Sequence, residues 1–174
     1  MVLAGDEASL YLQASLMRVW ALVGQTPVVR VATNRDNTHF YGALNLLTGE
    51  EIVMRSAVMT GEVSVLFLQQ ILSAYPDAPI LLLWDRATWH HGAEMRAFLA
   101  SHPRLEIMWL PPGCPELNPQ EHVWKAARES VSHNHGHTKL PMLAQEFERY
   151  LRETRFACSL LAQHDYVRIC NMFK

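Results

Sequence analysis

Residues 80–110 read ILLLWDRATWHHGAEMRAFLASHPRLEIMWL, in which a helical pattern separates two apolar runs. The first run, residues 80–84, is continuous and ends at Asp85, as expected for a central strand that is buried on both faces. Residues 93–100 carry apolar side chains on one side of a helix, and residues 105–110 form the second apolar strand. Because a strand–helix–strand unit crosses over with a right hand, the stretch predicts a pair of parallel strands.

The rest of the chain predicts an antiparallel half of the same sheet and further helices. Residues 48 and 49, Thr-Gly, lie between two apolar stretches and are a hairpin signal. Three early antiparallel strands followed by parallel strands, with helices on the faces, predict an α/β fold with a mixed sheet. The additional elements are strands at 2–12, 39–47 and 51–57, and helices at 62–73, from Pro119 to about 132, and at 142–154.

The composition predicts one globular domain without a membrane segment. At 174 residues and 49% hydrophobic, the chain can bury a single core, and no apolar run reaches the roughly 18 residues that a membrane span requires. The N-terminus lacks the pattern of a signal peptide. Cys114, Cys158 and Cys170 form no CxxC pair, so a reducing cytoplasm is expected. The net charge of −2 is unlike that of a stand-alone nucleic-acid binder, which is usually basic.

Two aspartates lie at positions where carboxylates are unusual. Asp85 ends the buried strand, and the carboxyl ends of strands are where α/β sheets build their sites. Asp6 lies inside an apolar strand, where β-propensity disfavours an acid. Each also has a structural interpretation: Asp85 as a turn residue or helix cap, and Asp6 as a residue on an exposed strand face.

Glu121 has two interpretations that the sequence leaves open. It follows the proline-rich stretch LPPGCPELNPQ, in which Asn118 is a good helix cap and Pro119 suits the first helical position. The Asn-x-x-Glu spacing resembles a capping box, in which the glutamate bonds to the amide of the cap residue. Alternatively, Glu121 is a third acid of the same site as Asp6 and Asp85.

A site made of three acids needs a cation. Carboxylates that converge without a basic partner repel one another, and oxygen-only ligands suit Mg²⁺ or Mn²⁺. Two such ions about 4 Å apart can activate an attacking oxygen and stabilise the leaving oxygen of a phosphodiester. The sequence therefore suggests two divalent ions held by Asp6, Asp85 and Glu121.

Residues 81–125, LLLWDRATWHHGAEMRAFLASHPRLEIMWLPPGCPELNPQEHVWK, resemble the core of bacterial insertion-sequence transposases of the mariner superfamily. In that family a DDE triad lies on a ribonuclease-H-like fold. Its second acid lies in an Asp-x-Ala-x-x-His pattern, here Asp85 to His90, and its third in a block that ends here with Glu121 and Trp124. The first acid corresponds to Asp6 in GDEASL, which is followed by the family's W…G…P residues at 20, 24 and 27.

The resemblance implies an enzyme that cuts DNA at the ends of a mobile element and transfers the strand to target DNA. It further implies a homodimer when active. Family members usually carry N-terminal helix-turn-helix domains, and this sequence starts close to the first catalytic strand. Residues 1–174 are therefore expected to be the catalytic domain alone, either as a separate reading frame that works with a helix-turn-helix subunit or as a truncated copy. The alternatives are a ribonuclease-H-like or resolvase-like nuclease without strand transfer, and an inactive remnant that only binds DNA.

Four side chains are expected near the DNA. Arg86 replaces the usual asparagine after the second acid and is either a phosphate contact or a solvent-facing residue. His90 is a candidate for orienting a phosphate or a carboxylate, and otherwise a structural donor. Lys125 and Arg128 lie one helical turn beyond Glu121, where backbone phosphates are expected. The loop SHNHGH, residues 132–137, lacks the spacing of a helical zinc site and is interpreted as a polar loop near DNA.

Overall fold

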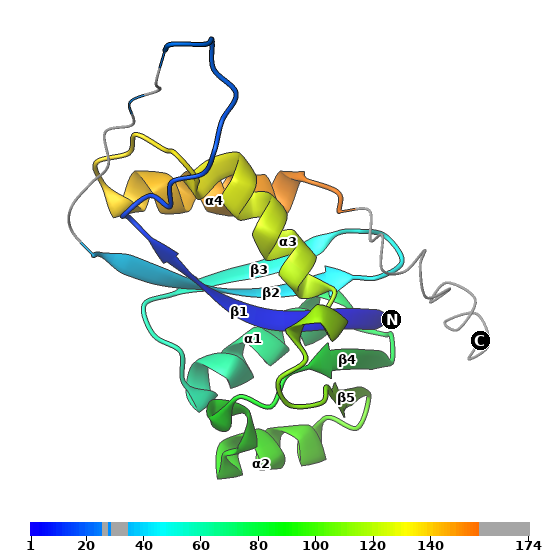
Figure 1. The fold of residues 1–174 in the computed structure, drawn as a ribbon. Coiled ribbons are helices and arrows are strands. Elements are labelled where there is room, and N and C mark those ends of the chain that lie inside the picture. The colour runs from blue at the N-terminus through cyan, green and yellow to red at the C-terminus, as the bar shows by residue number, and fades with distance from the viewer. Residues whose placement is uncertain (26–27, 29–34, 157–174) are drawn as a thin grey trace.

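The structure, a computed structural model, describes residues 1–25, 28 and 35–156. Pro27, Cys158 and Cys170 therefore lie outside the described residues. The five strands of the sheet follow the order β3-β2-β1-β4-β5, as Figure 1 shows. They are β1 (Val2–Tyr11), β2 (Asn37–Asn45), β3 (Glu51–Ser56), β4 (Ile80–Trp84) and β5 (Leu105–Trp109).

The predicted mixed sheet is confirmed. β1 pairs with β2 in antiparallel fashion over its whole length, and β2 pairs with β3 in the same way. β4 and β5 are parallel. β1 joins the two halves, because its first residues also pair in parallel with β4, ending at Ala4 opposite Leu83. The first strand of the chain is thus the centre of the sheet.

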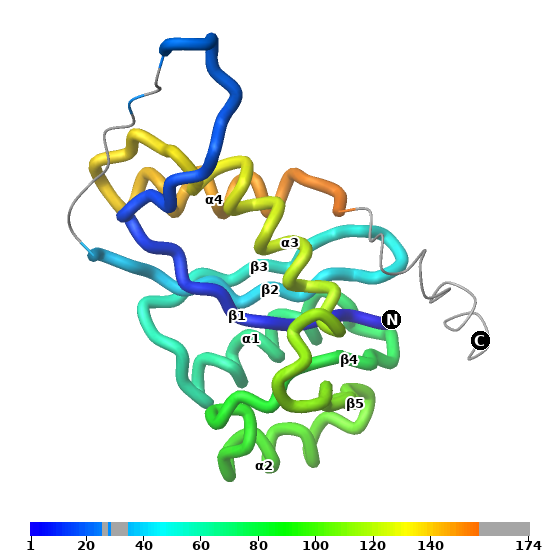
Figure 2. The backbone as a smooth tube through the Cα atoms, in the orientation of Figure 1, coloured from blue at the N-terminus to red at the C-terminus, as the bar shows by residue number. Residues whose placement is uncertain are grey.

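Helices cover both faces of the sheet (Figures 1 and 2). One core packs α1 and α2 against the face that carries Leu3, Tyr41 and Leu82. The other packs α3 and α4 against the face that carries Ala4 and Phe40. The alternation along β1 follows the two-residue period of a strand, so neighbouring residues face opposite cores. The helices are α1 (Gly61–Ala74), α2 (Ala93–Ser101), α3 (Gln120–Ala127) and α4 (Leu140–Glu153).

The helix predicted from Pro119 to about Ser132 changes its hydrogen bonding along its length. α3 begins one residue after Pro119 and ends at Ala127. A π-helical turn, Arg128–Ser132, continues it, and the N–H of His133 donates to the Arg128 carbonyl at 2.8 Å. The Ser132 hydroxyl also donates to this carbonyl, at 3.4 Å. A serine hydroxyl competes in this way with regular helical bonding.

The SHNHGH loop anchors the segment that follows β1. Asn134 has a positive φ of 52° and bonds both backbone groups of Met17, accepting from its N–H at 2.9 Å and donating to its carbonyl at 3.1 Å. His137 pairs with Glu146 of α4 at 2.9 Å and donates its backbone N–H to the ring of His135. The histidines thus hold the loop in place. Among the described residues, no helix has the length and apolarity to span a membrane.

Candidate active site

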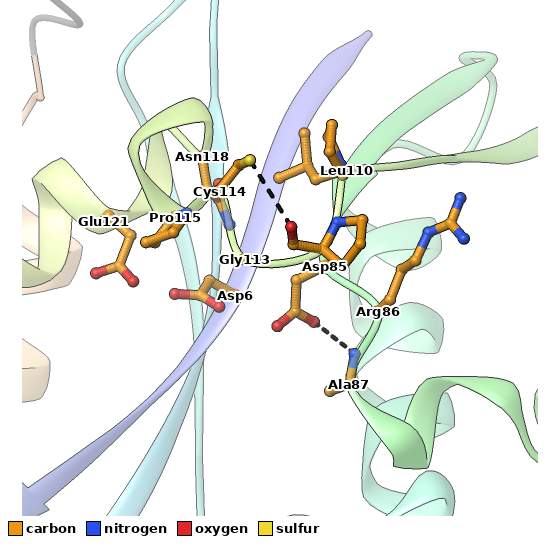
Figure 3. A pocket seen from close by; sticks show the side chains of 12 residues that line it. Asp6, Asp85, Arg86, Ala87, Leu110, Gly113, Cys114, Pro115, Asn118 and Glu121 are labelled. Atoms are coloured by element: carbon orange, nitrogen blue, oxygen red, sulfur yellow. Dashed lines mark hydrogen bonds between the residues drawn. The ribbon is translucent and has the colours of Figure 1, made fainter.

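A pocket of about 310 Å³ lies where β1 and β4 run side by side. Because Ala4 pairs with Leu83 in parallel register, Asp6 and Asp85 each lie two residues farther along neighbouring strands. Glu121, in the first turn of α3, lines the same pocket. Figure 3 shows the three carboxyl groups around this pocket. The wall is completed by Arg86, Ala87, Asn118 and residues 110–115.

Asp6 is the buried acid of the pocket. The indole Nε1–H of Trp124 donates to its Oδ2 at 3.0 Å, and the residue is 9% exposed. Burial, together with the nearby charges of Glu121, Glu7 and Asp85, raises the pKa of Asp6 to about 8. Without a cation, this carboxyl group therefore keeps its proton near neutral pH. A divalent ion would favour the charged form.

Asp85 lies directly after β4, and its side chain is 47% exposed. Its Oδ1 accepts from the backbone N–H of Ala87 at 3.1 Å, which is the turn contact expected of a structural aspartate. The same oxygen lies 3.1 Å from Nδ1 of His90. The hydrogen bond from His90 lowers the pKa of Asp85 despite partial burial. Asp85 is thus both a turn residue and an ionised wall of the pocket.

The start of α3 differs from the predicted one, because Pro119 and not Asn118 occupies the cap position, and the reciprocal bond of a capping box is replaced by other contacts of Asn118. Asn118 Oδ1 accepts from the N–H of Gln120 at 3.1 Å. The amide N–H of Asn118 donates to the Pro115 carbonyl at 2.9 Å, so it is already bonded. Its side-chain amide donates to the Gly5 carbonyl at 2.9 Å and ties the helix start to β1. The Glu121 carboxylate lies on the side of Asp6 instead (Figure 3).

A second buried acid fixes α3 on the sheet. Gln120 is fully buried, and its amide donates to Oε1 of Glu51 at 2.6 Å while its carbonyl accepts from the N–H of Leu44 at 3.0 Å. Burial raises the pKa of Glu51 well above its ordinary value. The pair needs space opposite Asp6, and Gly42 provides it, because an added Cβ would collide with Glu51, Gln120 and Trp124.

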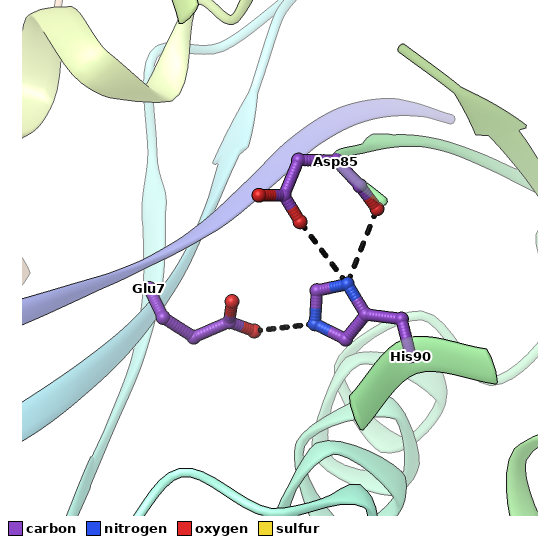
Figure 4. A group of neighbouring side chains, drawn as sticks. All are labelled: Glu7, Asp85 and His90. Carbon is purple, nitrogen blue, oxygen red and sulfur yellow. Dashed lines mark hydrogen bonds and ion pairs between the residues drawn. The ribbon is translucent and has the colours of Figure 1, made fainter. Parts of the chain in front are cut away.

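Glu7 was not predicted as a site residue, although it lies beside Asp6 in the chain. Its side chain is 3% exposed and points to the opposite face of β1, where its Oε1 accepts from Nε2 of His90 at 3.1 Å. Figure 4 shows the imidazole between Glu7 and Asp85. Burial alone would lower the pKa of His90, but the hydrogen bonds to Asp85 and Glu7 outweigh it and raise the pKa to about 9. A carboxylate that faces a core needs a hydrogen-bonding or charged partner. The acid at position 7, within an apolar strand, was therefore the sequence signal for a second polar contact.

The side chains expected near DNA divide into two groups. His90 is 1% exposed and lies beneath the pocket, so its contacts are with carboxylates rather than with solvent. Arg86 is exposed and lines the pocket. Lys125 is exposed and Arg128 is partly exposed, both beyond the pocket along the helix of Glu121. Of these three surface cations, Arg86 lines the pocket together with the carboxylates, whereas Lys125 and Arg128 are not among the lining residues.

Known proteins resemble this chain in sequence and in fold. Residues 1–143 match the family described as DDE superfamily endonuclease. The "Insertion element IS630 uncharacterized 39 kDa protein" of Shigella sonnei is 24% identical over 149 residues, which cover 84% of this chain and 43% of that protein. The Mos1 transposase paired-end complex with left transposon end has a TM-score of 0.67 at 11% identity, over 90% of this chain and 49% of that chain. The catalytic domain of Mos1 mariner transposase has a TM-score of 0.60 at 10% identity, over 88% and 70%.

The likeness to Mos1 transposase confirms the ribonuclease-H-like fold predicted from the sequence. The chain spans less than half the length of the Shigella sonnei relative. The family match, in contrast, includes all three acids of the pocket, Asp6, Asp85 and Glu121, and most of the 174 residues. This chain belongs to the DDE superfamily of endonucleases.

Proposed function

We propose that this chain is the catalytic domain of a DNA transposase, which cleaves at the ends of a mobile element and transfers the strand into target DNA. One observation carries the proposal: three carboxylates from β1, the end of β4 and the start of α3 line one pocket. Among the described residues, the protein gives Asp6 a hydrogen bond from Trp124 but no cationic partner. That set of oxygen ligands suits a hard divalent cation.

The residues present fit Mg²⁺ or Mn²⁺, held by Asp6, Asp85 and Glu121. Related structures named for their metals include the Mos1 paired-end complex with Mn and the one with Mg. Two bound ions would supply Lewis-acid stabilisation of the attacking and leaving oxygens. The chain itself places the ligands: Trp124 fixes one oxygen of Asp6, and Asn118 joins the helix start of Glu121 to β1 through the Gly5 carbonyl.

The DNA backbone would cross the rim of the pocket. Arg86 lines the pocket and offers a guanidinium that suits a phosphate. Lys125 and Arg128 continue along the helix of Glu121 and supply further positive charge. With a net charge of −2, the chain alone is expected to bind DNA weakly and without sequence preference. We propose that recognition of the element ends comes from a helix-turn-helix unit outside residues 1–174.

The active form is proposed to be a homodimer. The segment after β1 is anchored at its base by Asn134, and it carries large apolar side chains that are exposed to solvent. They are Leu16, Met17, Val19, Trp20, Leu22 and Val23. Burying such side chains against a second copy of the chain is favourable. Light scattering with and without DNA, on wild type and on a Trp20→Ser variant, measures this association.

The substitution Glu121→Gln tests whether this residue is a metal ligand or a helix cap. Glutamine also serves in a capping box, but it lacks the charge that a divalent cation requires. The proposal expects unchanged folding and a loss of Mn²⁺-dependent cleavage of a duplex. If the variant cuts at the wild-type rate, Glu121 is a helix cap and not a metal ligand. Cleavage by the wild type without joining to a target duplex would instead indicate a nuclease without strand transfer.

A further inference from the structure

We propose that Glu7 and His90 form a positioning pair that fixes the Asp85 carboxylate for metal binding. The inference rests on the proposed function, because Asp85 is assigned there as a ligand. It adds a role for two residues that do not line the pocket. Figure 4 shows the arrangement, in which one oxygen of Asp85 faces the imidazole and the other points away from it.

Asp85 needs such a support because it lies at an exposed position. With 47% of its side chain exposed, a carboxylate at a strand end would rotate freely if only the Ala87 N–H held it. His90 bonds to it twice, with Nδ1 at 3.1 Å from Oδ1 and at 3.2 Å from the backbone carbonyl. One oxygen is thereby fixed, and Oδ2 is left without a hydrogen bond from any residue in the described ranges.

His90 can serve as a support because it is itself immobile. Its ring lies against the indole of Trp84, with centroids 3.8 Å apart, and faces Trp109 at 6.4 Å. Its side chain is 0% exposed. A ring packed in this way holds its orientation and transmits it to the carboxylate through Nδ1.

Glu7 completes the support from the other side of the ring. Both ring nitrogens of His90 face acceptors, Nδ1 toward Asp85 and Nε2 toward Glu7 at 3.1 Å. The contact with Glu7 fixes the ring at the nitrogen opposite Nδ1. Because Glu7 follows Asp6 in β1, the same strand carries one proposed ligand and the support of another.

Two substitutions of equal chemistry separate the contacts of the ring. In His90→Asn the amide nitrogen takes the place of Nδ1 and keeps a donor toward Asp85. In His90→Gln it takes the place of Nε2 and keeps a donor toward Glu7. Each variant retains one amide donor and loses the other, so they differ only in which carboxylate is supported. His90→Ala removes both donors, and Met95→Ala, at a buried residue of α2, controls for lost stability on the same face.

The measurement is binding of Mn²⁺ alone to the full chain, by calorimetric titration and by the shift in melting temperature. Supporting residues of metal ligands typically change affinity about 10–100-fold. We expect the full weakening in His90→Gln and His90→Ala, which lose the contact with Asp85. We expect no more than about tenfold in His90→Asn, which loses only the contact with Glu7, and none in Met95→Ala.

Equal affinities in all three His90 variants and wild type would overturn the inference, as would a weaker His90→Asn than His90→Gln. A loss in Met95→Ala equal to that in His90→Ala would also overturn it, because the effect would then come from stability. Failure of the wild type to bind Mn²⁺ is a different outcome, which rejects the metal site of the proposed function and the support with it.

Discussion

Asp6 and Glu7 are neighbours in β1, but their carboxyl groups face opposite sides of the sheet and have different charged groups around them. On the α3 face, Asp6 is surrounded by the negative charges of Glu121 and Asp85, and burial raises its pKa to about 8. On the other face, Glu7 is almost fully buried but is paired with His90. Among the residues that the structure describes, Glu7 has a cationic partner in His90 and Asp6 has none. We propose Asp6 as a metal ligand because of this missing counter-charge and not because of its burial, which Glu7 shares.

The largest expected difference between the two faces is in catalysis. Asp6→Asn removes a proposed ligand, so cleavage of a duplex in Mn²⁺ should fall on the order of 10³-fold or more. Glu7→Gln removes only the charge behind His90, so the loss should stay near tenfold, the lower end for a supporting residue. Single-turnover nicking assays on both proteins measure this. Equal losses would show that the two faces are not functionally distinct.

The next effect concerns the pH dependence of stability without metal. Asp6 has a folded pKa of about 8 against an ordinary value of 3.8, so the folded protein holds a proton that the unfolded chain releases. Its stabilising contribution is fully present below the ordinary pKa and is lost as pH rises toward 8.

We therefore expect the free energy of unfolding to fall between pH 4 and 8, by on the order of a few kcal/mol more in wild type than in Asp6→Asn. Urea unfolding in chelator at several pH values measures both curves. Glu7→Gln is the comparison variant and should keep most of the fall, because burial, the largest cause of the raised pKa of Asp6, remains. Parallel curves for wild type and Asp6→Asn would contradict the assignment.

The packing opposite Asp6 gives a smaller effect. Gly42 pairs with Asp6 across β1 and β2, and a Cβ there would collide with Glu51, Gln120 and Trp124. Gly42→Ala should lower the free energy of unfolding by about 1–3 kcal/mol, as overpacked cores do. Gly136→Ala is the control, because a Cβ at that position has no neighbour within 4 Å. Equal stability of the two variants would mean that α3 can shift away.

The smallest expected effect comes from Glu51, a buried acid on the same face of the sheet as Asp6, which is bonded to an amide and not to a cation. Its partner is the Gln120 amide, and burial raises its pKa well above the ordinary value. Near neutral pH this shift costs stability, because the unfolded chain has released the proton. Glu51→Gln should therefore raise the free energy of unfolding at pH 7, because glutamine has no proton to release. The gain should vanish near pH 4, where both states are protonated, and a loss at pH 7 would contradict it.

Local patterns in the sequence predicted the elements and the three acids, but not their supports. Asp85 could be found because it ends an apolar run, and Glu121 because it follows the Asn118-Pro119 helix start. Glu7 and Gln120 are different, since their partners lie 83 and 69 residues away in the chain. The hydrophobic periodicity of a strand or helix does not predict contacts between residues so far apart in the chain. The sequence also did not predict the π-helical turn, in which the Arg128 carbonyl accepts from both the His133 N–H and the Ser132 hydroxyl.

The central place of β1 has a consequence for how the protein is made. Synthesis delivers this strand first, yet its parallel neighbour β4 begins at Ile80, and the bond from Asn118 to the Gly5 carbonyl spans 113 residues. Contacts of such separation form late and slow folding. The pocket therefore cannot exist on a chain that has not yet reached Glu121. An endonuclease built in this order is harmless to the DNA around it until its synthesis and folding are well advanced.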